Sequence, residues 1–225
     1  MIVAARDEAD RIGGTLSALR AAFPGARLVV ADDGSRDATA ALARRAGAET
    51  TGSAGRGESG RGKGGAMTAA ALRLLADGAP PRVVLLCDGD LGDSAGRLGP
   101  LVDAVEDGRC DLAVAAFARR QGGGLGAAVG FARWAIKSLT GLELSAPISG
   151  QRAMRGELLP ELLPFAPGFA VETAMTIDAV RAGARVQELE LDLEHRATGR
   201  TLSGFAHRGR QLAYFVYAYA TRRRR

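Results

Sequence analysis

The chain has 225 residues, of which 47% are hydrophobic, so it can bury a sizeable core and is not globally disordered. Its net charge is only +5, from 30 basic and 25 acidic residues. The basic excess is concentrated near the C-terminal end, at Arg196, Arg200, Arg208, Arg210 and the run Arg222–Arg225. Because the rest of the chain is close to neutral, we expect no nucleic-acid partner.

Cysteine content and hydropathy indicate the compartment. Cys87 and Cys110 are the only cysteines, and both lie in apolar runs, as buried reduced thiols do. The sequence contains no recognisable signal peptide and no apolar run of about 18 residues. We therefore expect a cytoplasmic protein that does not cross a membrane.

Strand-like and helix-like segments alternate through the first half of the chain. Apolar runs typical of strands cover 2–5, 27–31, 48–51, 82–87 and 111–117. Helical spacing covers 8–22, 38–46, 64–77 and 96–107. This order predicts an α/β fold with a central, mostly parallel sheet flanked by helices, in which ligands bind beyond the carboxyl ends of the strands.

The second half has a different pattern. Helices are expected over 131–141, 156–163 and 169–182, followed by a strand from Val186 that ends at Glu194. The candidate domain boundary follows residue 197, so that residues 198–225 form a basic amphipathic helix or tail.

The most informative motif is Asp88-Gly89-Asp90, directly after the apolar strand at 82–87. Two carboxylates one residue apart can coordinate the same hard cation, and such a cation can neutralise a pyrophosphate leaving group. The alternative is an ordinary turn, in which Asp-Gly is common.

A second acidic cluster, Asp32-Asp33, follows the strand at 27–31. A carboxylate at a strand end can accept a hydrogen bond from the edge of a uracil or guanine base. A helix cap with a turn would explain the same residues without a ligand.

The glycine-rich stretch GRGESGRGKGG allows two interpretations. Gly57 to Lys63 matches most of a P-loop, the Walker A motif. The segment VVLLCDGD resembles the Walker B strand, which ends in an acidic residue. A P-loop NTPase is therefore the alternative enzyme class. However, Gly64 stands where a magnesium-binding hydroxyl residue is required. A basic, glycine-rich loop that contacts a diphosphate explains the stretch better.

Taken in order, the segments VAARDEADRI, VVADDGSRDAT, GRGKGGAM, VVLLCDGDL, ISGQRAMR and GFAVETAMTID resemble the family 2 glycosyltransferases and their relatives. The motifs are most similar to those of the glucosyl-3-phosphoglycerate synthases, which are retaining enzymes, and the first half is similar to the polyprenyl-phosphate sugar transferases. The resemblance covers most of residues 2–196. It implies a GT-A fold, a catalytic domain over 1–197, and transfer of a hexose from a UDP- or GDP-sugar with Mg²⁺ or Mn²⁺.

The resemblance also implies roles for individual residues. Asp90 is the principal metal ligand, with Asp88 beside it and His195 completing the site. Glu172 and Asp90 are the catalytic candidates, and Gly150, Gln151 and Arg152 are placed near the acceptor. Residues implied to bind the nucleotide sugar are Ala4, Arg6, Glu8, Asp32, Asp33, Lys63, Asp88 and Gly89.

The acceptor is left open between a phosphorylated small molecule and a lipid phosphate, because Gly150-Gln151-Arg152 replaces a Gly-Glu-Tyr-like segment of the similar enzymes. Whether the anomeric configuration is retained or inverted is also open. Residues 201–225 suit either a helix packed on the domain or on a second copy, or a peripheral contact at the inner face of an anionic membrane. An inactive, membrane-associated scaffold on the same fold is the non-enzymatic alternative.

Overall fold

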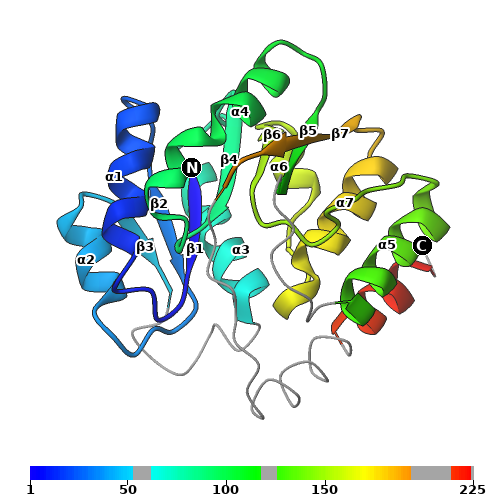
Figure 1. The fold of residues 1–225 in the computed structure, drawn as a ribbon, viewed down its shortest axis with the longest axis horizontal. Coiled ribbons are helices and arrows are strands. Elements are labelled where there is room, and N and C mark those ends of the chain that lie inside the picture. The colour runs from blue at the N-terminus through cyan, green and yellow to red at the C-terminus, as the bar shows by residue number, and fades with distance from the viewer. Residues whose placement is uncertain (53–61, 118–125, 194–213, 224–225) are drawn as a thin grey trace.

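The computed structural model describes residues 1–52, 62–117, 126–193 and 214–223 (Figure 1). Its first half contains β1 (Ile2–Ala5), α1 (Ile12–Ala22), β2 (Val29–Asp32), α2 (Thr39–Arg45), β3 (Glu49–Thr51), α3 (Gly62–Leu75) and β4 (Val83–Asp88). The 3₁₀ helix η1 (Gly92–Leu98), α4 (Gly99–Glu106), β5 (Leu112–Phe117) and α5 (Gly126–Thr140) follow. The last elements are β6 (Arg152–Arg155), α6 (Leu158–Glu161), η2 (Gly168–Ala170), α7 (Val171–Arg181), β7 (Val186–Leu191) and a helical segment over 214–223.

Within the described residues, the strands form one sheet in the order β3-β2-β1-β4-β6-β5-β7. Every neighbouring pair is parallel except β4 with β6 and β6 with β5, which are antiparallel. The predicted α/β fold with a mostly parallel mixed sheet is therefore confirmed.

Alternating strand residues build a core on each face of the sheet. Val3, Val30 and Leu85 pack with α1, η1 and α4 on one face. Ile2, Val29 and Leu86 pack with α3, α6 and α7 on the other. Because successive side chains of a strand point to opposite faces, the continuous apolar runs of β1, β2 and β4 supply both cores at once.

Several segments depart from the sequence prediction. The first helix begins at Ile12 and not at residue 8, because residues 6–11 form a loop beyond β1. The helix expected over 96–107 is a 3₁₀ turn followed by α4. Strand β6 was not predicted, because four residues reading Arg-Ala-Met-Arg carry no clear strand period.

The C-terminal helical segment packs on the domain. Phe215 and Ala218 are buried in a cluster with Ala132 of α5 and Ala174 of α7. Arg222 forms an ion pair with Asp178 of α7. Figure 1 shows this segment, in red, beside α5. The proposed boundary at residue 197 lies in 194–213, outside the described residues, and stays a prediction.

Candidate active site

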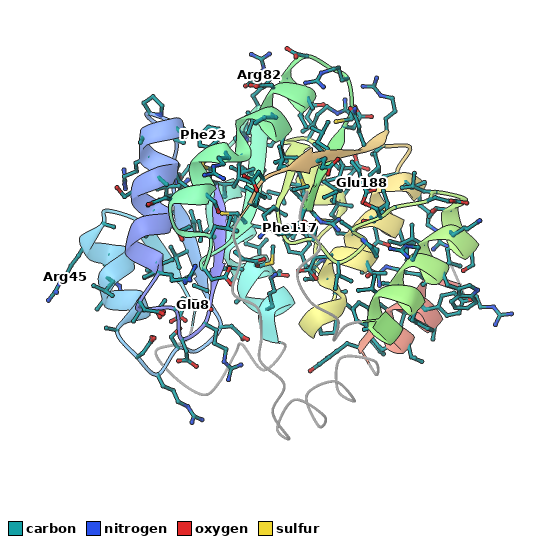
Figure 2. All side chains as sticks on the ribbon, in the orientation of Figure 1. Glu8, Phe23, Arg45, Arg82, Phe117 and Glu188 are labelled. Atoms are coloured by element: carbon teal, nitrogen blue, oxygen red, sulfur yellow. The ribbon has the colours of Figure 1, made fainter. Side chains whose placement is uncertain are left out.

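The carboxyl ends of β1, β2 and β4 lie side by side, which brings the two acidic motifs to one edge of the sheet. The register pairs Ala5 with Asp32 of β2 and Ala4 with Asp88 of β4. In parallel sheets this edge is where ligands bind. Figure 2 shows Glu8 near this edge, with Arg82, which precedes β4, at the opposite end of the molecule.

Two loops interlock at the end of β1 and β2, where the nucleoside pocket is predicted. Arg6 donates a 3.2 Å hydrogen bond to Asp33, and the Glu8 amide donates one of 2.8 Å to the Thr39 hydroxyl. Burial raises the pKa of Asp33, and the Arg6 guanidinium opposes that increase.

Asp32 Oδ1 accepts hydrogen bonds from the Ser35 amide, at 2.9 Å, and from the Ser35 hydroxyl. The Asp32 carboxylate thus shapes the turn after β2, as the cap-and-turn alternative expected. That role is compatible with a base contact, since a carboxylate has about four lone-pair sites.

The turn Asp88-Gly89-Asp90 is tightly clamped. The Gly89 amide donates to the Ala4 carbonyl at 2.8 Å, and the Thr15 hydroxyl donates to the Gly89 carbonyl at 2.8 Å. A Cβ on Gly89 would lie 3.1 Å from the Ala5 Cβ and 3.2 Å from the Ala4 oxygen, so the backbone approach favours glycine. Thr15 has no recognisable signal in the sequence, and only the fold shows that it holds this turn.

Lys63, in the first turn of α3, joins two acidic residues of the site. Its Nζ donates 2.6 Å to Asp88 Oδ1 and 2.7 Å to Glu172 Oε1. Burial alone would lower the pKa of Lys63, but the two carboxylates outweigh it and raise the pKa well above its usual value. The ammonium is therefore charged at neutral pH and fixes the positions of both carboxylates.

The loop before β6 supplies a second contact to Asp88. Gln151 is 1% exposed, and its Nε2 donates 2.9 Å to Asp88 Oδ2. The Ser149 hydroxyl donates 3.2 Å to Gln151 Oε1. A Cβ on Gly150 would lie 2.5 Å from Asp88 Oδ2, so this loop lies directly against the motif.

Arg152, which the family resemblance places near the acceptor, is held inside the domain. Its side chain is fully buried and donates to the Ser149 carbonyl at 2.8 Å, the Thr176 hydroxyl at 2.8 Å and the Pro147 carbonyl at 3.3 Å. Burial lowers the pKa of Arg152 to about 10. The guanidinium anchors the loop before β6 to α7, and its implied role near the acceptor stays a prediction.

The chemistry of the motif fits a divalent cation. Mg²⁺ in proteins is usually held by one or two carboxylates together with substrate phosphates, and Asp88 and Asp90 supply two carboxylates. The described residues contain no group of three or more potential metal-ligating side chains. His195, the third predicted ligand, lies outside the described residues.

The P-loop alternative is not supported by the topology. Residues 53–61 lie outside the described residues, and Lys63 pairs with Asp88 and Glu172. Strand β3, which precedes the stretch, is at the sheet edge, with β2 and β1 between it and β4.

None of the described helices is long and apolar enough to span a bilayer.

The chain is similar to solved structures of a glycosyltransferase. A crystal structure of glucosyl-3-phosphoglycerate synthase from Mycobacterium tuberculosis with Mn²⁺, UDP-glucose and phosphoglyceric acid is 26% identical, with a TM-score of 0.74 over 97% of this chain and 78% of that one. The same enzyme with Mg²⁺ and UDP is 27% identical, with the same TM-score and coverage. A comparison with curated proteins gives no match.

The family assignment rests on a match over a continuous part of the chain. The model of "Glycosyl transferase family 2" matches residues 1–149, which include β1, β2, β4 and both acidic motifs. Since that region is more than half of the 225 residues, the chain belongs to glycosyl transferase family 2.

Proposed function

We propose that the protein transfers a hexose from a UDP-sugar to a small phosphorylated acceptor, with Mg²⁺ or Mn²⁺ bound at Asp90 and Asp88. The observation that carries this proposal is the convergence of Lys63, Asp88, Gln151 and Glu172 beside the clamped turn at Asp90. The solved structures with Mn²⁺, UDP-glucose and phosphoglyceric acid support the choice of uridine over guanosine.

The donor nucleotide would lie at the carboxyl edge of β1, β2 and β4. Ala4, Arg6, Glu8, Asp32 and Asp33 would line the nucleoside side of this pocket, and Lys63, Asp88 and Gly89 the diphosphate side. The cation, held by Asp90 with Asp88 and His195, would stabilise the negative charge on the leaving diphosphate.

The protein's own residues would hold the reacting groups in place. Lys63 binds Oδ1 of Asp88 and Gln151 binds Oδ2, so that a different side chain holds each oxygen and the carboxylate cannot rotate. Glu172, which is 8% exposed at its side chain, would face the transferred sugar from the first turn of α7. Gly150 and Gln151 would border the acceptor, where prepositioned groups lower the entropic cost of reaction.

Thermal-shift measurements test the donor. UDP-, GDP- and dTDP-sugars are compared with and without Mn²⁺, and we expect only the uridine nucleotides to raise the melting temperature, and only with metal. Equal shifts with GDP-sugars would overturn the choice of nucleotide. The absence of any metal-dependent shift would overturn the nucleotide-sugar site itself.

Product analysis tests the acceptor. Release of UDP from UDP-glucose is measured with 3-phosphoglycerate and glycerol 3-phosphate, and with unphosphorylated glycerate and glycerol as controls. We expect release only with the phosphorylated pair, because the similar solved structures hold phosphoglyceric acid and glycerol 3-phosphate beside UDP-glucose. The inactive-scaffold alternative predicts no turnover with any acceptor.

We also propose a peripheral contact with an anionic bilayer through α5 and residues 214–223. Trp134 and Tyr217 are more than half exposed, Val216 nearly so, and Trp134 stacks 4.8 Å from Tyr219 across the two helices. Neither segment contains an acidic residue, whereas they carry the basic residues Arg133, Lys137 and Arg223. Exposed aromatic side chains accompanied by basic residues suit the interface of an anionic membrane.

Co-sedimentation with phosphatidylcholine vesicles, with and without phosphatidylglycerol, tests this contact at the full chain length. The double variant Trp134→Ala/Tyr217→Ala should lose binding to the anionic vesicles, and Leu72→Ala, which alters an equally exposed apolar residue on α3, should keep it. The wild-type protein could instead bind neither kind of vesicle and form dimers that the double variant disrupts. That result would assign the surface to contact with a second copy of the chain.

A further inference from the structure

The C-terminal helical segment packs against the loop at 166–168, which leads through η2 into α7. Gly168 of η2 has a φ of +64°, and a Cβ there would lie 2.7 Å from two ring carbons of Tyr214. The Tyr214 ring therefore covers the backbone of Gly168 so closely that a side chain at this position would have to displace the ring.

The opposite side of the same loop packs against the start of α3. A Cβ on Gly62 would lie 3.4 Å from the Gly168 Cα, and one on Gly64 would lie 1.8 Å from the Ala166 oxygen. The Phe165 amide donates 3.0 Å to the Thr68 hydroxyl, which fixes the loop to α3 one turn further along.

Lys63 lies between those two glycines, and the loop continues through η2 into the first turn of α7, which carries Glu172. The layers are therefore Tyr214, the loop at 166–168, and the α3 terminus. The 2.7 Å contact between Lys63 and Glu172 spans the last two layers. Loss of the outer layer would let the loop move away from α3.

Other contacts hold Tyr214 in this place. Phe215, next in sequence, is 3% exposed and packs with Ala166 and Ala170, the residues that flank Gly168. At the other end of the segment Arg222 is bound to Asp178, and the Arg222 carbonyl accepts 2.6 Å from Arg181. The segment is thus anchored at both ends, which holds the Tyr214 backbone beside Gly168.

We infer that Tyr214 is a positioning residue for the active site: it presses the 166–168 loop onto the α3 terminus and so sets the relative position of Lys63 and Glu172. This inference rests on the proposed function for its consequence in catalysis, but the packing it describes does not. Tyr214 touches neither of the two charged residues and acts through the loop backbone.

The test compares Tyr214→Ala with Tyr214→Phe, which keeps the ring, and with Tyr217→Ala, which removes an exposed ring from the same segment. Hydrogen–deuterium exchange is followed in peptides that cover 62–68 and 166–172. Tyr214→Ala should exchange faster in both peptides, whereas Tyr214→Phe and Tyr217→Ala should match the wild type.

Steady-state kinetics give the second readout. Tyr214→Ala should lower kcat by about tenfold, since small displacements of reacting groups are costly, with Tyr214→Phe restoring it. Equal exchange and equal kcat in Tyr214→Ala and Tyr217→Ala would overturn the inference, and so would faster exchange spread over the whole chain with kcat unchanged. If the wild type shows no transfer activity, the proposed function fails, and the exchange data alone decide the positioning role.

Discussion

Lys63 and Glu172 form a 2.7 Å hydrogen-bonded ion pair across 109 residues of sequence. The pair joins the start of α3 to the start of α7, and therefore joins the half of the chain that would bind the nucleotide to the half that would shape the acceptor pocket. Because Lys63 also binds Asp88, its ammonium is the common partner of two carboxylates at one edge of the sheet.

Lys63→Ala should inactivate the enzyme and weaken the fold together. Removal of the ammonium leaves two partly buried carboxylates without their cation, which we expect to cost less than the roughly 3–5 kcal/mol of a fully buried pair, because Asp88 is 32% exposed. Urea unfolding and UDP release measure the two effects. Lys137→Ala removes an exposed lysine and should change neither, and a fully active Lys63→Ala would contradict the role of the pair.

Asp90→Asn should remove the metal-dependent part of nucleotide binding while the fold survives, since the residue follows a strand end and is not in the core. The measurement is the shift in melting temperature caused by UDP with Mn²⁺, minus that caused by UDP alone. Asp93→Asn changes an exposed acid in η1 and serves as the matched control. A metal-dependent shift that persists in Asp90→Asn would exclude this residue as the principal ligand.

Gly150→Ala should disturb Asp88 without removing any charge. The new methyl group would lie 2.5 Å from Asp88 Oδ2, so either the carboxylate or the loop must move. We expect weaker UDP binding in titration calorimetry. The control is Gly13→Ala in α1, where nothing lies within 4 Å of the added Cβ. This change should leave UDP binding unaltered and stabilise the fold by about 0.5–1 kcal/mol. An unchanged affinity of Gly150→Ala for UDP would show that the loop can shift without disturbing Asp88.

Asp111 should make the stability of the fold sensitive to acid. Hydrogen bonds from Arg185, and then the charge of Arg155, hold the pKa of Asp111 below its usual 3.8. A carboxyl whose pKa is lower in the folded state stabilises the fold above its unfolded pKa and loses that contribution as the pH falls through its folded pKa. Asp111→Asn should therefore lower the free energy of unfolding at pH 7 and flatten its decline below about pH 4. An equally steep acid decline in the variant would place the responsible carboxyl elsewhere.

The first half of the fold was largely predictable from sequence, and the reason is local. β1, β2 and β4 are continuous apolar runs ending in acidic turns, and that combination specifies buried parallel strands. β6 was missed because its pairing is decided by its neighbours in space: it inserts between β4 and β5, with Ala153 opposite both Leu85 and Ala113.

The sequence indicates candidate residues for the site but not the contacts among them. Asp88, Asp90, Lys63 and Glu172 were all identified as functional candidates, but no spacing in the sequence indicates that Lys63 meets Glu172. The sequence likewise gives no sign that the Arg152 side chain is fully buried, and its implied place near the acceptor stays a prediction. The sequence also gives no indication that Tyr214 packs on the backbone of Gly168, and only the fold brings these two residues together.

The antiparallel strand β6 also limits how this enzyme can be re-engineered. The region that matches the family model ends at residue 149, three positions before β6 begins at Arg152. A fragment or chimera cut at that point would leave β4 and β5 with unpaired edges in the middle of the sheet, and such edges promote association with other chains. Exchange of acceptor-recognition segments between relatives should therefore keep residues 152–155 with the first half and join the new sequence after them.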